Sequence, residues 1–129
     1  MATGFPASTG DVLSAAMFNG LTSYTVGTAN TTDYTATISD AYQVLEIMNK
    51  ATAIAFNIPT NASVAFPIGT AITILNIGAG LCTIKAVTPA TTTVLSAGAT
   101  AAQPTLAQYK TAVAIKTGTD TWYVAGAIA

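Results

Sequence analysis

The sequence predicts an all-β fold, an antiparallel β-sandwich or jelly-roll-like barrel with a short N-terminal arm and helix. Short runs alternate between apolar and polar residues, as where Ile54, Phe56 and Ile58 alternate with Ala55 and Asn57, and this period of two is typical of strands. Turn-forming residues separate about eight such runs at near-regular spacing. Hydrophobic residues make up 51% of the chain, and the excess is mostly β-favouring Val and Ile with Ala rather than Leu, which argues against a helical bundle.

Residues 1–33 are predicted to form an N-terminal arm, a short helix and a linker ahead of a β-sandwich domain at 34–129. The arm, Met1 to Thr9, is small and polar, and Thr9 or Asp11 can cap a helix that Asn19-Gly20 ends. The linker from Ser23 to Asp33 is rich in residues that favour turns over ladders. The apolar side of the helix packs either on the β domain or on a partner, and we expect the partner contacts to involve Phe5, Leu13, Met17 and Phe18.

The β domain is expected to begin with two strands joined by a turn at Asp40-Ala41. The alternation in the first strand places Tyr34, Ala36 and Ile38 inward. In the second strand the inward residues are expected to be Leu45 and Ile47, and the outward ones Val44, Glu46 and Met48.

The central stretch is predicted to contain three strands. Pro59 ends the strand at 54–58, since proline lacks the N–H that a β-ladder needs. Ile72 and Ile74 mark the next strand. Gly78-Ala79-Gly80 is interpreted as a hairpin turn, because glycine tolerates positive φ, and the returning strand has Cys82, Ile84 and Ala86 inward.

The C-terminal part is predicted to contain a short strand near Thr92 to Leu95, a loop from Ser96 to Thr105, and a final hairpin. That hairpin turns at Gly118-Thr119-Asp120. Its first strand alternates Ala112, Ala114 and Lys116 with Val113 and Ile115, and in the second Trp122, Val124 and Gly126 share a face. We expect one core that contains Ile54, Phe56, Ile58, Ile72, Ile74, Ile84 and Trp122.

The residues that most enzymes use are missing or scattered, so we expect no catalytic site, cofactor or metal. There is no histidine, and the single cysteine, Cys82, is predicted to be a core residue. The carboxylates are dispersed and are best explained as caps and turns: Asp11, Asp33, Asp40, Glu46 and Asp120. Asn61-Ala62-Ser63 fits a glycosylation sequon but is interpreted as a turn.

Charge and hydropathy exclude further classes of partner. The net charge is −1 and arginine is absent, so the chain lacks the basic surface of a nucleic-acid binder. The apolar stretch from Ala65 to Val87 is interrupted by Pro67, Asn76 and three glycines, which argues against a transmembrane helix. The N-terminus lacks the pattern of a signal peptide, so we expect assembly inside a cell.

Several segments resemble a pattern that recurs in tailed-bacteriophage virion proteins. They are Asn61-Ala62-Ser63-Val64-Ala65-Phe66-Pro67-Ile68-Gly69-Thr70, Gly78-Ala79-Gly80, Thr83-Ile84, Gln108-Tyr109, Ile115-Lys116 and Gly118-Thr119-Asp120-Thr121-Trp122. The resemblance spans roughly Tyr34 to the C-terminus, and the chain departs from the pattern between Ser96 and Gln108. It implies a β-structured, trimeric component of a virion and no shared catalytic residue.

The expected function is that of a capsid decoration or cement protein, found on the capsid surface after assembly in the host cytoplasm. Its expected partners are the major capsid protein and further copies of itself, because only 7% of the residues are charged and part of the apolar surface needs cover. The alternative is a trimeric head or tip module of a tail fibre that binds a host surface glycan. The short region ahead of the β domain favours the first.

Overall fold

The computed structural model describes residues 23–129, and apart from one 3-10 helix their regular structure is all β. The predicted arm and helix lie outside the described residues. The elements are β1 (Thr25–Val26), β2 (Tyr34–Thr35), the 3-10 helix η1 (Ile38–Ala41), β3 (Val44–Met48), β4 (Ile54–Ile58), β5 (Ala71–Asn76), β6 (Cys82–Ala86), β7 (Thr93–Ser96), β8 (Thr105–Leu106), β9 (Lys110–Gly118) and β10 (Thr121–Gly126).

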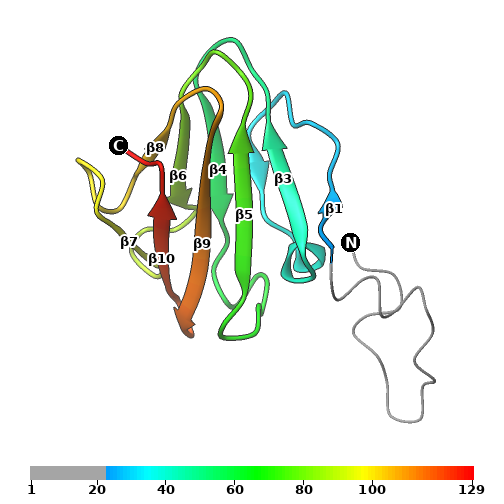
Figure 1. Ribbon diagram of the computed structural model, residues 1–129. Coiled ribbons are helices and arrows are strands. Elements are labelled where there is room, and N and C mark those ends of the chain that lie inside the picture. Colours follow the sequence, from blue (N-terminus) through cyan, green and yellow to red (C-terminus); the bar gives the residue numbers. More distant parts are fainter. Residues whose placement is uncertain (1–22) are drawn as a thin grey trace, which may run out of the picture.

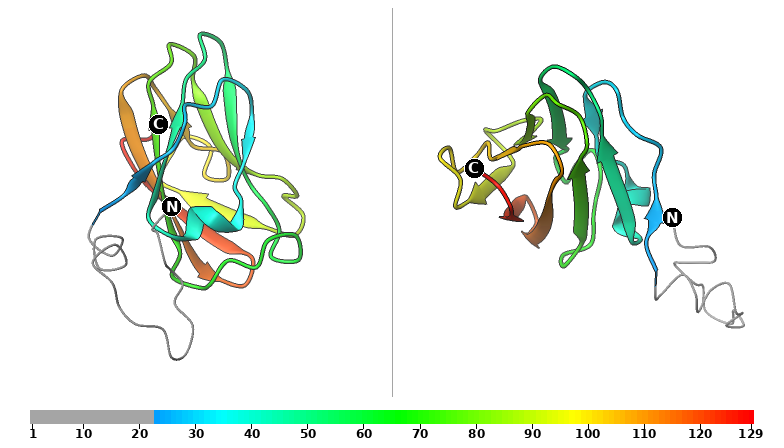
Figure 2. Two further views of the ribbon diagram at one scale, coloured as in Figure 1. Left: turned by 90° about the vertical axis from the view of Figure 1, so that its right-hand side faces the viewer. Right: turned by 45° about the horizontal axis from the view of Figure 1, so that its top comes forward.

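The strands form two sheets that enclose the buried core (Figures 1 and 2). The six-stranded sheet has the order β1-β3-β5-β9-β10-β7, and Figure 1 looks onto it, with β10, β9, β5, β3 and β1 from left to right. The four-stranded sheet, β2-β4-β6-β8, lies behind it. Both sheets are mixed, so the prediction of an antiparallel sandwich or jelly roll is wrong in strand direction, although the all-β class is confirmed.

The first six strands alternate between the two sheets, and we call residues 25–86 the coil. Each of β3, β4, β5 and β6 pairs in parallel with the strand two before it. The β3–β5 and β4–β6 ladders share one offset of 28 residues along the chain (45 to 73 and 54 to 82). Each new turn of the coil therefore stacks on the previous one and adds one strand to each sheet, as in solenoid repeat proteins.

The chain does not form a hairpin at Gly78-Ala79-Gly80, and this prediction is wrong. The segment crosses from the six-stranded to the four-stranded sheet, and it stacks on the preceding crossing, where Gly80 N–H donates to the Lys50 carbonyl at 2.9 Å. A Cβ on Gly78 would overlap the Lys50 backbone, and one on Gly80 would overlap the Thr52 carbonyl. The glycines are present because two backbones approach closely, not because a turn needs positive φ.

The C-terminal strands follow the sequence predictions more closely. Strands β9 and β10 form the expected antiparallel hairpin with its turn at Gly118-Thr119-Asp120. Strand β9 pairs antiparallel with β5 and so joins the hairpin to the coil. Strand β7 confirms the short strand predicted near Thr92 to Leu95 and lies parallel to β10 at the sheet edge. Strand β8 is not among the predicted strands, and it begins at Thr105, the last residue of the predicted loop.

The predicted core is confirmed, since all seven expected residues belong to one buried cluster between the sheets. Trp122 contacts Phe66 edge to face, with ring centroids 5.5 Å apart. Cys82 is fully buried as expected, and burial raises the pKa of its thiol to about 11.

The start of the β domain differs from the prediction in three ways. Thr25 and Val26, placed in the linker, pair with β3 as a strand. Ile38, expected inside, is 46% exposed, because the chain turns into η1 after Ala36. Strand β3 has the predicted period but the opposite phase: Val44, Glu46 and Met48 are buried, whereas Leu45 and Ile47 are only half-buried.

The inverted phase of β3 is accompanied by hydrogen-bond partners for its inward Glu46. The inward Glu46 carboxylate accepts a hydrogen bond from Asn30 Nδ2 at 3.0 Å and lies beside Asp40. Asp40 itself accepts from the Thr37 backbone N–H and from the Tyr34 hydroxyl. A polar side chain can be buried where such partners exist, and hydropathy alone does not reveal them.

Candidate interaction surface

The outward positions of the six-stranded sheet form an uncharged, mainly apolar surface, which we call the apolar face. Along one row, Leu45, Thr73, Val113 and Ala125 lie in register across four strands. A second row joins Ala71, Ile115, Tyr123 and Leu95. Among the large members, Val26, Ile115 and Tyr123 are exposed.

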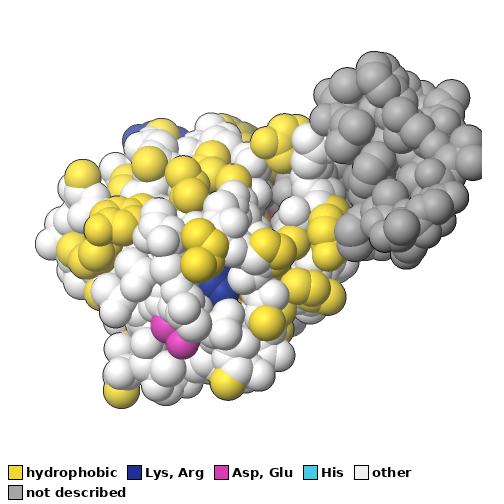
Figure 3. Space-filling view, turned by 90° about the horizontal axis from the view of Figure 1, so that it is seen from below, with side chains coloured by type: hydrophobic (Ala, Val, Ile, Leu, Met, Phe, Trp, Pro, Cys, Tyr) yellow, Lys and Arg dark blue, Asp and Glu magenta, His cyan; other side chains and the backbone are white. Residues whose placement is uncertain are grey.

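Charged side chains are rare over the rest of the described surface as well. In the view from below, hydrophobic side chains are scattered among white atoms and only a few charged atoms are in sight (Figure 3). An uncharged β surface can approach another protein without the desolvation cost of Lys or Glu. The apolar face is therefore the strongest candidate for a protein contact in the described part of the chain.

The outward side of the four-stranded sheet is different, because it is polar and concave. Thr35, Asn57 and Lys85 lie in register across β2, β4 and β6, and Gln103 borders the same hollow. The hollow measures about 340 Å³, and a neighbouring one of about 250 Å³ adds Asp33 and Thr83. We call this surface the polar groove; it offers amide, hydroxyl and amine groups but includes no aromatic ring among its lining residues.

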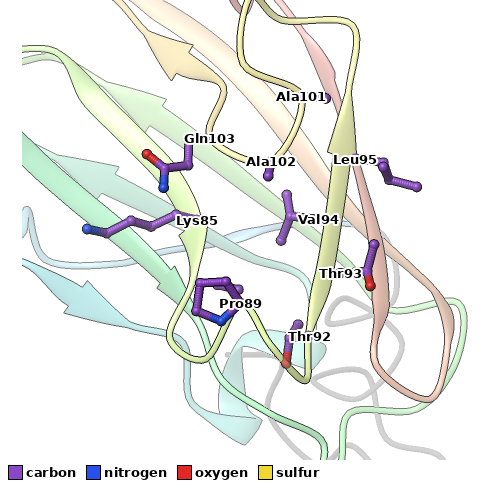
Figure 4. A pocket seen from close by; sticks show the side chains of 10 residues that line it. Lys85, Pro89, Thr92, Thr93, Val94, Leu95, Ala101, Ala102 and Gln103 are labelled. Atoms are coloured by element: carbon purple, nitrogen blue, oxygen red, sulfur yellow. The ribbon is translucent and has the colours of Figure 1, made fainter.

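A third pocket, of about 220 Å³, continues the polar groove toward β7. Figure 4 shows that Val94, Ala102 and Pro89 point into it, whereas the side chain of Lys85 extends away from it. Its lining is mainly apolar, with hydroxyl and amide groups confined to a few positions such as Thr92 and Gln103. The pocket therefore offers mainly apolar contact and a few hydrogen-bonding groups.

A buried acidic cluster lies between η1 and β3. Asp40 and Glu46 are 1% and 7% exposed, and the Tyr34 hydroxyl donates to Asp40 Oδ2 at 2.6 Å. Burial and, after it, a side-chain hydrogen bond with Asp40 raise the pKa of Glu46 to about 7, while Asn30 acts in the opposite direction. Burial and the bond to Asp40 likewise raise the pKa of Tyr34. The raised pKa of Glu46 follows from the burial of this carboxyl group beside a second one.

A second buried polar cluster surrounds Lys116, at the hairpin end of β9. The Lys116 amine donates to Asn61 Oδ1 at 2.6 Å and to the Phe66 carbonyl at 2.8 Å, and the residue is 2% exposed. Asp120 Oδ1 accepts from the Asn61 backbone N–H at 2.8 Å and from the Thr92 hydroxyl at 3.2 Å. Burial lowers the pKa of Lys116, and the charge of Asp120 raises it in part.

Three of the segments that carry the phage resemblance meet at this cluster. The loop that begins at Asn61 is far in sequence from the end of β9 and from the turn at Asp120, but it bonds to both. Backbone bonds between Gly69 and Lys116 and between Lys116 and Thr70 add to these contacts. The segments are therefore parts of one structural unit, in which a loop closes one end of the core.

Sequence reasoning did not foresee either buried cluster as a site. The signal for the second was available, since Lys116 shares the inward phase of Ala112 and Ala114. For the acidic cluster, the sequence pattern predicts that Glu46 faces outward, whereas in the structure it faces inward. The four predicted partner-binding residues, Phe5, Leu13, Met17 and Phe18, all lie outside the described residues.

Residues 23–129 contain neither a metal-binding cluster nor a membrane-spanning helix. No group of three or more His, Cys, Asp or Glu side chains in residues 23–129 is arranged to hold a metal ion. None of the described helices is long and apolar enough to cross a bilayer.

Comparison with known proteins gives no relative for this chain. No family model matches it, and neither a curated protein nor a solved structure does.

Proposed function

We propose that this protein is a non-enzymatic structural component of a phage virion, and specifically a decoration or cement protein that binds the major capsid protein. The observation that carries the proposal is the apolar face, where exposed Val26, Ile115 and Tyr123 accompany outward strand positions without a charged side chain. A surface of this kind gains free energy when another protein covers it. The resemblance described above supports the virion assignment.

In this proposal the protein forms a closed homo-oligomer, a trimer, on the outside of the capsid head and stabilises it. Apolar and backbone contacts hold the subunits to the lattice, and no cofactor, nucleic acid or membrane takes part. Such contacts tolerate salt, because apolar burial does not depend on screening, whereas charge-driven binding weakens as the Debye length falls to about 3 Å at 1 M salt.

The test is to strip the protein from capsids and add it back across a salt series, recording occupancy and the sedimentation of the free protein. Rebinding that persists at about 1 M salt, together with sedimentation as an oligomer, is the expected result. A monomer at micromolar concentration, or rebinding lost at high salt, would overturn the proposal.

A matched pair of variants assigns the binding surface. Ile115→Lys places a charge on the apolar face and should weaken rebinding by about tenfold or more, because an unpaired charge would be buried. Asn57→Lys adds the same charge in the polar groove and should leave rebinding unchanged. Equal effects of the two substitutions would exclude the apolar face as the contact.

The polar groove favours a second candidate function, the head or tip module of a tail fibre. Asn57, Lys85 and Gln103 present hydrogen-bonding groups that suit sugar hydroxyls. Binding to host surface glycans that Asn57→Lys abolishes, with no affinity for capsid heads, would favour this candidate. Imaging labelled protein on intact particles, at the head or at the tail tip, distinguishes the two directly.

A further inference from the structure

The amine of Lys116 ends among carbonyl groups inside the protein. It donates hydrogen bonds to Asn61 Oδ1 and to the Phe66 carbonyl, at 2.6 and 2.8 Å. On β10 the residue in register with Lys116 is Trp122, which is itself buried against Phe66. The Lys116 side chain is thus buried and its amine is bonded to two carbonyl oxygens; burial lowers the pKa of the amine, and the charge of Asp120 raises it in part.

The deprotonated form of a lysine amine is a nucleophile, and a carboxamide lies next to the amine of Lys116. The side-chain carbon of Asn61, Cγ, is one C=O bond from Oδ1, so it lies within about 3.8 Å of the Lys116 amine. Reacting atoms in productive complexes are about 3–3.5 Å apart, so a small rotation of the Asn61 side chain brings the pair into range.

The position of Asn61 is fixed by contacts other than its bond to the amine. Asp120 Oδ1 accepts the Asn61 backbone N–H at 2.8 Å, and the Thr92 hydroxyl donates to the same oxygen. The loop after Asn61 is attached to β9 by backbone bonds of 2.8 Å from Gly69 N–H to the Lys116 carbonyl and 2.9 Å from Lys116 N–H to the Thr70 carbonyl. Asn61 is therefore held by Asp120, and the loop that carries Asn61 is attached to the strand that carries Lys116.

From this geometry we propose that Lys116 and Asn61 form an intramolecular isopeptide bond once the chain has folded. The Nζ–Cγ bond forms, the Cγ–Nδ2 bond breaks, and one proton of the amine passes to Nδ2, which leaves as ammonia. The step needs no oxidant, cofactor or external reactant. The product is a neutral amide that removes the buried amine.

The bond would fasten the loop between β4 and β5 to the C-terminal hairpin. The chain has one cysteine and so no intrachain disulfide is possible. A covalent link between residues so far apart in sequence restricts the unfolded chain as a disulfide does. The inference is independent of the proposed binding to capsids.

The first measurement is the intact mass of the folded wild-type protein. We expect a mass below that of the sequence by one molecule of ammonia, and a branched peptide that joins the Asn61 and Lys116 segments after proteolysis. The full sequence mass would overturn the proposal. Loss of ammonia with only linear peptides would overturn it too, because that result places the change within a single asparagine.

Variants then assign the two partners. Lys116→Met and Asn61→Ala should each restore the full mass, whereas Lys85→Met, which removes an amine from the outer side of the four-stranded sheet, should keep the loss of ammonia. In the Asn61→Asp variant, the same bond to Lys116 would release water in place of ammonia. Because the wild-type mass is decisive by itself, a variant that fails to fold does not prevent the test.

Discussion

The coil and the C-terminal hairpin reach the same sheet by different routes. In the coil, neighbouring strands are parallel and one winding apart in sequence, so the crossings must stack and glycines allow the contact between backbones. In the hairpin, neighbouring strands are antiparallel and a short turn joins them. Gly78 and Gly80 in the coil therefore mark the close approach of two backbones, whereas Gly118 in the hairpin turn has only the Thr121 side chain nearby.

The largest effect is expected from Gly80→Ala, with Gly118→Ala as its matched control. The new methyl group at position 80 would overlap the Thr52 carbonyl oxygen, and backbone cannot move aside as a side chain can. We expect a loss of more than about 4 kcal/mol in the free energy of unfolding, enough to unfold the domain. At position 118 the nearest atoms belong to the Thr121 side chain at 3.5 Å, so the cost should stay below about 1 kcal/mol. Urea denaturation of both variants checks the comparison, and equal costs would contradict it.

The second prediction is that Phe56→Ala in the coil and Trp122→Ala in the hairpin each remove about 3–5 kcal/mol, because both side chains fill one shared core. Each variant should unfold in a single transition, which circular dichroism reports together with tryptophan fluorescence in Phe56→Ala and with tyrosine fluorescence in Trp122→Ala, because Trp122 is the only tryptophan. The partly exposed Tyr123 provides a control, and Tyr123→Ala should cost about 1 kcal/mol or less. Separate transitions would show that the coil and the hairpin are independent units.

The third prediction concerns pH and the acidic cluster at the edge of the coil. Glu46 has a pKa raised from its ordinary 4.5 to about 7, so the folded state holds a proton that the unfolded state releases. The stabilisation is complete below about pH 4.5 and is lost as the pH rises through 7, on the order of 1–3 kcal/mol. Tyr34, Asp40 and Asn30 are the polar groups that face this carboxyl.

Glu46→Gln tests this effect, because the amide keeps the shape of the side chain and does not titrate. Wild-type urea midpoints should fall between about pH 5 and about pH 8, and the midpoints of the variant should change less. A wild-type midpoint that rises over this range would contradict the assignment.

The smallest effect on folding is expected from deleting Met1 to Leu21. The core cluster and every strand of the described part lie after this segment, so the β domain should keep its stability within about 1 kcal/mol. Attachment to capsids should weaken, as the predicted contacts of Phe5, Leu13, Met17 and Phe18 would be lost. Denaturation and rebinding are measured on the same preparation, and loss of folding would show that the segment completes the core.

Local sequence patterns predicted the β class, the strands from Ile54 onward except β8, the single core and the C-terminal hairpin. These features depend on local alternation and on turn residues, which act between neighbours in the chain. The same local signals identified Trp122 and Cys82 as core residues.

The tertiary structure decided strand direction, the phase of β3 and the role of Gly78 and Gly80. An alternation of apolar residues is the same whether a strand turns back beside its neighbour or crosses to the opposite sheet, so the period cannot distinguish a hairpin from a coil. The inward phase of Glu46 depends on Asn30 and Asp40, and the burial of Lys116 depends on Asn61 and Phe66. Hydrogen-bond partners that are distant in sequence determine which polar side chains a core accepts, and only the folded chain brings them together.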